Sequence, residues 1–130
     1  MISLTISEFE EKYYLHDSDI TKIDYDAENK TLTLEIEFCF WMQEWFIEGE
    51  LKNGLISVNF ENVSFYSYEG YEPEKLFSDY DPEILQTEIA DDMLIIYTFE
   101  FVRYEPGEDI YPIMKIKAEN VTVTELERYN

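Results

Sequence analysis

The sequence predicts a mainly β fold at the margin of α+β. We expect an antiparallel and strongly bent sheet, sandwich or open barrel, built from two similar βββ halves that are each preceded by a short helix. Three observations carry this prediction: alternating apolar and polar residues recur along the chain, the tripeptide Glu-Asn-Val occurs twice, and the alternation changes parity at both copies. The 130 residues are expected to form a single domain, 1–130, with an internal pseudo-repeat over 7–68 and 73–126.

Each half is predicted to begin with a short helix and a capped strand start. Ser7 and Glu10 suggest a capping box for a helix that ends near Tyr14, and Pro73 is placed to begin a helix that ends near Ser78. "HDSDI" (16–20) then corresponds to "YDPEI" (80–84). Asp and Ser bind nearby backbone amides, so these acids are expected to mark the start of a strand in each half.

The second strand of each half has the clearest alternation. "KTLTLEIEFCF" (30–40) places Leu32, Leu34, Ile36, Phe38 and Phe40 on one face, and "LIIYTFEFV" (94–102) is expected to turn Ile95, Tyr97, Phe99 and Phe101 inward. The first half then adds a predicted hairpin over 41–54, with Gly49 and Asn53-Gly54 as turn signals. The corresponding stretch of the second half, 103–112, contains Pro and Gly and is predicted to be a loop.

The last strands bend at the shared tripeptide. Inward positions are expected at Ile56, Val58 and Phe60, then Val63 and Phe65; in the second half they are Met114, Ile116 and Ala118, then Val121 and Val123. One extra residue reverses the two faces of a strand. The parity change therefore predicts a β-bulge or corner at Asn62 and another at Asn120.

The charge restricts the class of partner. Nine basic and 30 acidic residues leave a formal net charge of -21, which repels nucleic acid and anionic membranes and attracts basic proteins. Cys39 and His16 are the only residues of their types, so the sequence predicts neither a disulfide nor a metal site, and no cofactor. The first residues lack the pattern of a signal peptide and no stretch resembles a membrane span, so we expect a cytoplasmic protein.

Catalysis has one weak candidate. His16 beside Asp17 and Asp19 has the composition of a carboxylate-oriented base, but nothing marks Ser18 as a nucleophile, so a small hydrolase using His16 is a remote alternative to a non-enzyme. Acids over 24–35 are spaced like a calcium loop, but Asn29 stands where that loop requires glycine, and a hairpin turn explains them better.

Aromatic and acidic side chains favour binding. We expect Trp41, Trp45 and Tyr68 to supply contact area and the carboxylates of Glu48, Glu50, Glu69 and Glu72 to form an acidic rim for a basic protein partner. The alternative is a small-molecule or carbohydrate-binding module with an aromatic-lined cleft. The apolar faces of the extended strands also leave a homodimer open.

The segment "LHDSDITKIDYDAENKTLTLEIEF" (15–38) resembles small bacterial proteins with an "hD-x-x-I-x-x-I" segment followed by an "L-x-L-x-(I/L)" strand, some of them assigned as immunity proteins of polymorphic toxin systems. The matching positions are His16, Asp17, Ile20, Ile23, Leu32, Leu34 and Ile36. The resemblance implies a cytoplasmic protein that neutralises a cognate toxin by binding it, and it makes none of these positions catalytic.

Overall fold

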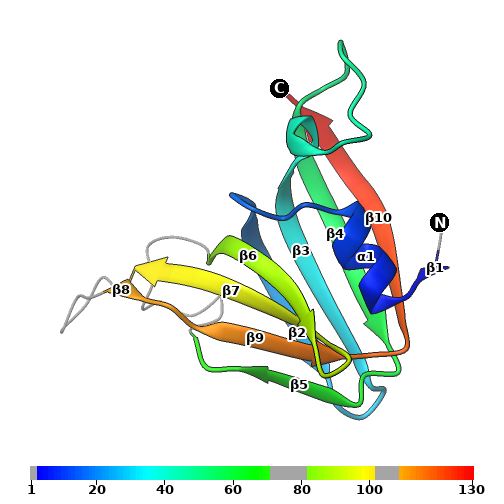
Figure 1. Ribbon diagram of the computed structural model, residues 1–130, viewed down its shortest axis with the longest axis vertical. Helices are drawn as coiled ribbons and strands as arrows, with labels where there is room; N and C mark the ends of the chain where they lie inside the picture. The colour runs from blue at the N-terminus through cyan, green and yellow to red at the C-terminus, as the bar shows by residue number, and fades with distance from the viewer. Residues whose placement is uncertain (1–2, 71–81, 102–108) are drawn as a thin grey trace.

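The computed structural model describes residues 3–70, 82–101 and 109–130 (Figure 1). These residues form one α-helix, one 3-10 helix and ten strands, which confirms the prediction of a mainly β fold. In chain order they are β1 (Ser3–Leu4), α1 (Ile6–Lys12), β2 (Asp19–Asp26), β3 (Thr31–Cys39), η1 (Phe40–Met42), β4 (Asn53–Glu61), β5 (Phe65–Tyr68), β6 (Glu83–Ala90), β7 (Met93–Phe101), β8 (Asp109–Ile110), β9 (Ile113–Lys117) and β10 (Asn120–Tyr129).

The strands form a single antiparallel sheet that is bent, as predicted, and is open rather than closed into a barrel. Its order is β1-β10-β4-β3-β2-β6-β7-β9-β5, with β8 paired to β7. Figure 1 shows two arms that meet at a steep angle, one formed by β10, β4, β3 and β2 and the other by β6, β7, β9 and β5. Helix α1 contacts β10 from one arm and both β6 and β7 from the other.

Apart from the two-residue β1 at one edge, the strand order is symmetric about the β2–β6 junction. From that junction outward, one arm contains β2, β3 and β4 of the first predicted half and then β10 of the second half. The other arm contains β6, β7 and β9 of the second half and then β5 of the first half. Strands β5 and β10 are therefore exchanged between the halves. Descent of the two halves from one repeated unit stays a prediction, because the arrangement of strands describes topology and not ancestry.

The junction itself pairs the two strand starts that share sequence. The Ile20 amide donates to the Pro82 carbonyl over 2.8 Å, and the Ile84 amide donates to the Ser18 carbonyl over 2.7 Å. Each strand shifts register directly afterwards, between Ile20 and Lys22 in β2 and between Ile84 and Gln86 in β6. A further hydrogen bond of 3.0 Å runs from the Asp17 amide to the Ile84 carbonyl. Both halves therefore donate hydrogen bonds across the junction, and each has one bulge beside it.

The chain changes arms at the two Glu-Asn-Val sites. Asn62 adopts a φ of 54° between β4 and β5, a conformation that Asn tolerates better than most residues, and this confirms the predicted corner. The second corner falls at residues 118–119, immediately before Asn120, which is the first residue of β10. The two crossings touch, because the Glu119 amide donates to the Glu61 carbonyl over 3.1 Å and the Asn62 side chain donates to the Glu119 carboxylate over 2.9 Å.

The core lies between the arms and beneath α1. The predicted inward residues of β3 and β4 are all buried: Leu32, Leu34, Ile36, Phe38, Ile56, Val58 and Phe60. From α1, Phe9 is 1% exposed, and its ring meets Phe60 edge-on at a centroid distance of 6.0 Å. Met114, Ile116 and Val121 are also buried as predicted.

Two predicted faces are wrong. In β7 the residues turned inward are Leu94, Ile96, Thr98 and Glu100. Of the residues predicted to face inward, Ile95 is buried at 8% exposure, but Tyr97 and Phe99 on the same face are only half-buried. The run Leu94-Ile95-Ile96 is apolar at every position, so its alternation fits either register, and a shift of one residue exchanges the faces. In β5, Phe65 is 45% exposed because Tyr66 and Tyr68 pack against the core instead.

Two local predictions also need correction. The cap of α1 is Thr5 with Glu8, two residues before the predicted pair, since the Glu8 amide donates to Thr5 Oγ1 and the Glu8 carboxylate accepts from the Thr5 amide. The predicted hairpin over 41–54 is absent, because residues 40–52 form η1 and turns, and Asn53-Gly54 begins β4. The predicted helix at 73–78 lies outside the described residues.

Candidate functional site

Residues 40–52, which we call the 40–52 loop, connect β3 to β4 at the end of one arm (Figure 1). Its base is closed by the Trp41 amide, which donates to the Lys52 carbonyl over 3.0 Å. Arg128 of β10 braces the far side through a hydrogen bond of 2.8 Å to the Leu51 carbonyl and an ion pair with Glu50 at 3.4 Å. The loop is therefore closed across its own base and fastened to β10, which limits the entropy it loses on binding.

The 40–52 loop exposes large apolar side chains. Ile47 is 66% exposed, Trp41 52%, Leu51 42% and Trp45 38%. The acids of the same loop, Glu44, Glu48 and Glu50, are also exposed. Apolar area bordered by charge is typical of a protein-binding surface, because single exposed apolar residues are common but a group of them is not.

Trp45 is held in one orientation. Its indole Nε1–H donates to the Lys12 carbonyl at the end of α1 over 2.9 Å. The ring stacks on Phe38 at a centroid distance of 6.4 Å and meets Tyr13 edge-on at 5.7 Å. Trp45 therefore presents a fixed, partly exposed aromatic ring beside α1.

Gln43 joins this loop to the chain that follows α1. Although it is polar, Gln43 is only 5% exposed. Its side-chain oxygen accepts from the Tyr14 amide over 2.8 Å, and its side-chain nitrogen donates to the Tyr14 carbonyl over 2.8 Å and to the Cys39 carbonyl over 2.9 Å. All these backbone groups are thereby satisfied without secondary structure.

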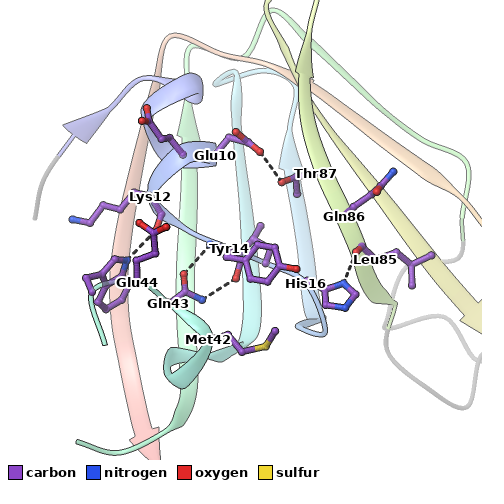
Figure 2. A pocket seen from close by; sticks show the side chains of 13 residues that line it. Glu10, Lys12, Tyr14, His16, Met42, Gln43, Glu44, Leu85, Gln86 and Thr87 are labelled. Carbon is purple, nitrogen blue, oxygen red and sulfur yellow. Dashed lines mark hydrogen bonds between the residues drawn. The ribbon is translucent and has the colours of Figure 1, made fainter. Parts of the chain in front are cut away.

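A cavity of about 900 Å³ opens between the end of α1, the 40–52 loop and β6 (Figure 2). Its lining combines aromatic, acidic and amide side chains. The residues are Glu10, Glu11, Lys12, Tyr14, Leu15, His16, Met42, Gln43, Glu44, Trp45, Leu85, Gln86 and Thr87. This size and mixture are usual for a ligand site, which needs an apolar surface for contact and a few polar groups for orientation.

His16 has a structural role at the wall of this cavity. Its Nδ1 lies 2.5 Å from the Leu85 carbonyl, so Nδ1 must carry the proton, and its Nε2 lies 3.3 Å from an Asp17 oxygen (Figure 2). The contact ties the start of the first half to β6 of the second. Ser18, the serine nearest to His16 in sequence, is fully buried and is not open to a substrate.

The sequence-predicted binding residues fall into two separate groups. Trp41, Trp45, Glu48 and Glu50 share the 40–52 loop, whereas Tyr68 and Glu69 lie at the end of β5 in the other arm (Figure 1). Glu72 lies outside the described residues.

Tyr68 is also turned inward. Its hydroxyl donates to the carboxylate of the buried Glu100, and burial together with that carboxylate raises the pKa of Tyr68. Its phenol is thus not displayed to a partner.

Sequence reasoning missed several residues of the site. Ile47 and Leu51 belong to the exposed apolar group, but a pattern that predicts a hairpin assigns them to strands. Tyr14, Gln86 and Thr87 come together only because β6 lies beside β2 across the junction. The available signal was the correspondence between "HDSDI" and "YDPEI". In the structure these two strand starts also pair with each other, which places residues 14–16 beside residues 85–87.

Comparisons with protein-family models, with curated proteins and with solved structures found no match for this chain. Among the described residues, no group of three or more His, Cys, Asp or Glu side chains is placed to hold a metal ion. No helix in the described ranges has the length and apolar character needed to cross a membrane. The site is therefore interpreted from its own geometry.

Proposed function

We propose that this chain is a non-enzymatic, acidic protein-binding protein with a basic protein partner. In its specific form the proposal is a cytoplasmic immunity protein that neutralises a basic toxin, such as a nuclease, by occluding it. The observation that carries the proposal is the 40–52 loop, where Trp41, Ile47 and Leu51 are 42–66% exposed among exposed glutamates.

The physical roles of the two features differ. The net charge of -21 would speed the encounter with a basic protein, and this effect weakens when salt shortens the Debye length. Desolvation of the exposed apolar side chains would supply most of the affinity, since aromatic residues in fixed positions are common binding hot spots. The bracing of the loop by Arg128 favours a surface that is already formed before binding.

Quantitative capture from a lysate of the source organism tests the proposal. The bait is the wild-type protein, the loop variant Trp41→Ser/Ile47→Ser, or the control variant Tyr25→Ser/Phe65→Ser, which removes two apolar side chains exposed by 41% and 45% on other strands. We expect a basic protein to bind the wild type and the control but not the loop variant.

The captured partner is then purified. Its association rate should fall about tenfold or more between low and high salt, and its expression should be toxic unless this chain is co-expressed. The protein-binding proposal would be refuted if the partner bound the loop variant as well as the wild type, or if its association rate did not change with salt concentration. A harmless partner would refute only the immunity role.

The cavity supports a second candidate, a small-molecule or carbohydrate-binding module. Tyr14 and Trp45 offer aromatic surface, and Gln86 and Thr87 offer neutral hydrogen-bonding groups. Titration with neutral mono- and disaccharides, followed through the NMR signal of the Trp45 indole N–H, tests this candidate. Saturable shifts would support it, and an unchanged spectrum at high sugar concentration would count against it.

A further inference from the structure

We propose that the cavity between α1, the 40–52 loop and β6 receives an arginine-containing segment of the basic partner. This inference rests on the proposed function, because it says where on this protein a positively charged part of the basic partner binds. The 40–52 loop supplies Met42, Glu44 and Trp45 to one wall of the cavity. A partner that covers the exposed loop would therefore also cover the mouth of the cavity.

The charges of the lining favour a cation. Glu10, Glu11 and Glu44 carry three negative charges, and Lys12 carries the one positive charge of a lysine or arginine among the lining residues. The Lys12 ammonium lies 5.7 Å from the centroid of the Tyr13 ring, and Figure 2 shows the side chain pointing away from Tyr14 and Gln43. Lys12 therefore does not place its positive charge beside Tyr14 and Gln43.

The aromatic groups favour a guanidinium over a simple ammonium. Tyr14 is 54% exposed and Trp45 is 38% exposed, and the indole N–H of Trp45 is already occupied by the Lys12 carbonyl. A ligand can therefore contact the ring of Trp45 but cannot accept a hydrogen bond from its indole N–H. A planar guanidinium can stack on such a ring while its N–H groups reach a carboxylate, which a lysine ammonium cannot do as well.

The size of the cavity favours a segment over a single side chain or a second copy. About 900 Å³ exceeds the volume of one arginine and suits a few residues of an extended or turned chain. A second copy of this protein is a poor occupant because it carries the same net charge of -21. The complementary occupant is a short segment with one or more arginines from a basic protein.

A peptide titration on the full-length protein tests the inference. The probe is acetylated tri-arginine amide, and its neutral counterpart has citrulline in place of each arginine. NMR signals of the Trp45 indole N–H and of the Tyr14, Gln86 and Thr87 amides report on the cavity. We expect the arginine peptide to shift these signals in a saturable way and the citrulline peptide to leave them nearly unchanged.

Two double variants separate a local site from diffuse charge. Glu11→Gln/Glu44→Gln removes two charges at the cavity, and Asp24→Asn/Glu28→Gln removes two exposed charges elsewhere. We expect about tenfold weaker peptide binding for the first and about twofold or less for the second. Equal losses in the two variants, equal binding of the citrulline peptide, or shifts confined to residues outside the cavity would each overturn the inference.

The same variants distinguish this inference from the proposed function. If the captured partner requires Trp41 and Ile47 but binds Glu11→Gln/Glu44→Gln as tightly as the wild type, the cavity is not its arginine site and the protein-binding function stands. If no basic partner depends on the loop, the proposed function itself is refuted. A partner that needs both the loop and the cavity acids supports the two together.

Discussion

Replacing Gln43 by methionine should destabilise the protein by about 3 kcal/mol, because each hydrogen bond contributes about 1 kcal/mol net and the Gln43 side chain makes three of them. Methionine has a similar length, so little packing is lost. The Tyr14 amide and the Cys39 carbonyl, however, lose their side-chain partner. Gln43 is only 5% exposed, so water can replace these bonds only in part. Against a total stability on the order of 10 kcal/mol for a chain of this length, the loss is large.

Urea unfolding followed by tryptophan fluorescence and circular dichroism measures this effect. With a slope of about 2 kcal/mol per molar urea, the midpoint should fall by about 1.5 M. The matched control is Gln86→Met, which changes an exposed amide on the opposite wall of the same cavity and should shift the midpoint little. A difference between the two variants of less than about 1 kcal/mol would show that the hydrogen bonds of Gln43 contribute little net stability.

Gln43→Glu gives an independent check through pH. The new carboxyl would face the Tyr14 and Cys39 carbonyls, so its protonated form is favoured and its pKa in the folded state should lie above the unfolded value. A raised folded pKa gives stability that is present at low pH and lost as pH rises. The deficit of Gln43→Glu relative to the wild type should therefore shrink as pH falls from 7 toward 4.5. A deficit that does not depend on pH would contradict the geometry around Gln43.

Three further predictions concern the frame of the site. In Gly54→Ala the added Cβ would clash with the Glu127 carbonyl oxygen and would lie 2.7 Å from the Phe40 ring. Calorimetry should show a loss of about 1–3 kcal/mol in the free energy of unfolding, and no loss if β10 could move aside. Thr5→Ala should lower the free energy of unfolding in urea by about 1 kcal/mol, because it removes the cap of α1. Ser7→Ala, at the cap position suggested by the sequence, should leave it nearly unchanged. The reverse result would contradict the observed cap. Above pH 10 the free energy of unfolding should fall, because the folded protein keeps the Tyr68 phenol protonated while the unfolded chain releases the proton. Tyr68→Phe should remove part of this pH dependence. An equal loss of stability in both proteins above pH 10 would exclude Tyr68 as a source.

The sequence predicts the sheet well where polar and apolar residues alternate without interruption. The inner face of β3 was correct at every position because Thr31, Thr33, Glu35 and Glu37 separate its apolar residues. In β7 the same method failed, since the buried face contains Thr98 and Glu100 and the opposite face contains Tyr97 and Phe99. A buried carboxyl is energetically costly unless it finds partners, so pattern reasoning assigns it to the surface. The hydrogen bond from the Tyr68 hydroxyl helps to explain why Glu100 is buried, and this contact forms only in the folded structure.

The candidate site was predictable only in part. Trp41 and Trp45 were identified because aromatic residues next to a turn are not all needed in a core, and both are exposed. The cavity depends instead on contacts across a long separation in sequence, such as Glu10 with Thr87 and His16 with Leu85. No local pattern specifies such pairs. The helix cap of Thr5 and Glu8 was within reach of the sequence, but Ser7 and Glu10 form an equally good pattern two residues later.

The exchange of β5 and β10 between the arms makes each half a necessary part of the other. A chain cut between Gly70 and Pro82 would give one fragment with β4 exposed where β10 had been, and another with β9 exposed where β5 had been. Each fragment would carry the strand that covers the other's open edge. The two fragments should therefore fail to fold separately and should reassemble when they are mixed. Because each half completes the sheet of the other, the binding surface at the 40–52 loop should form only when both halves are present.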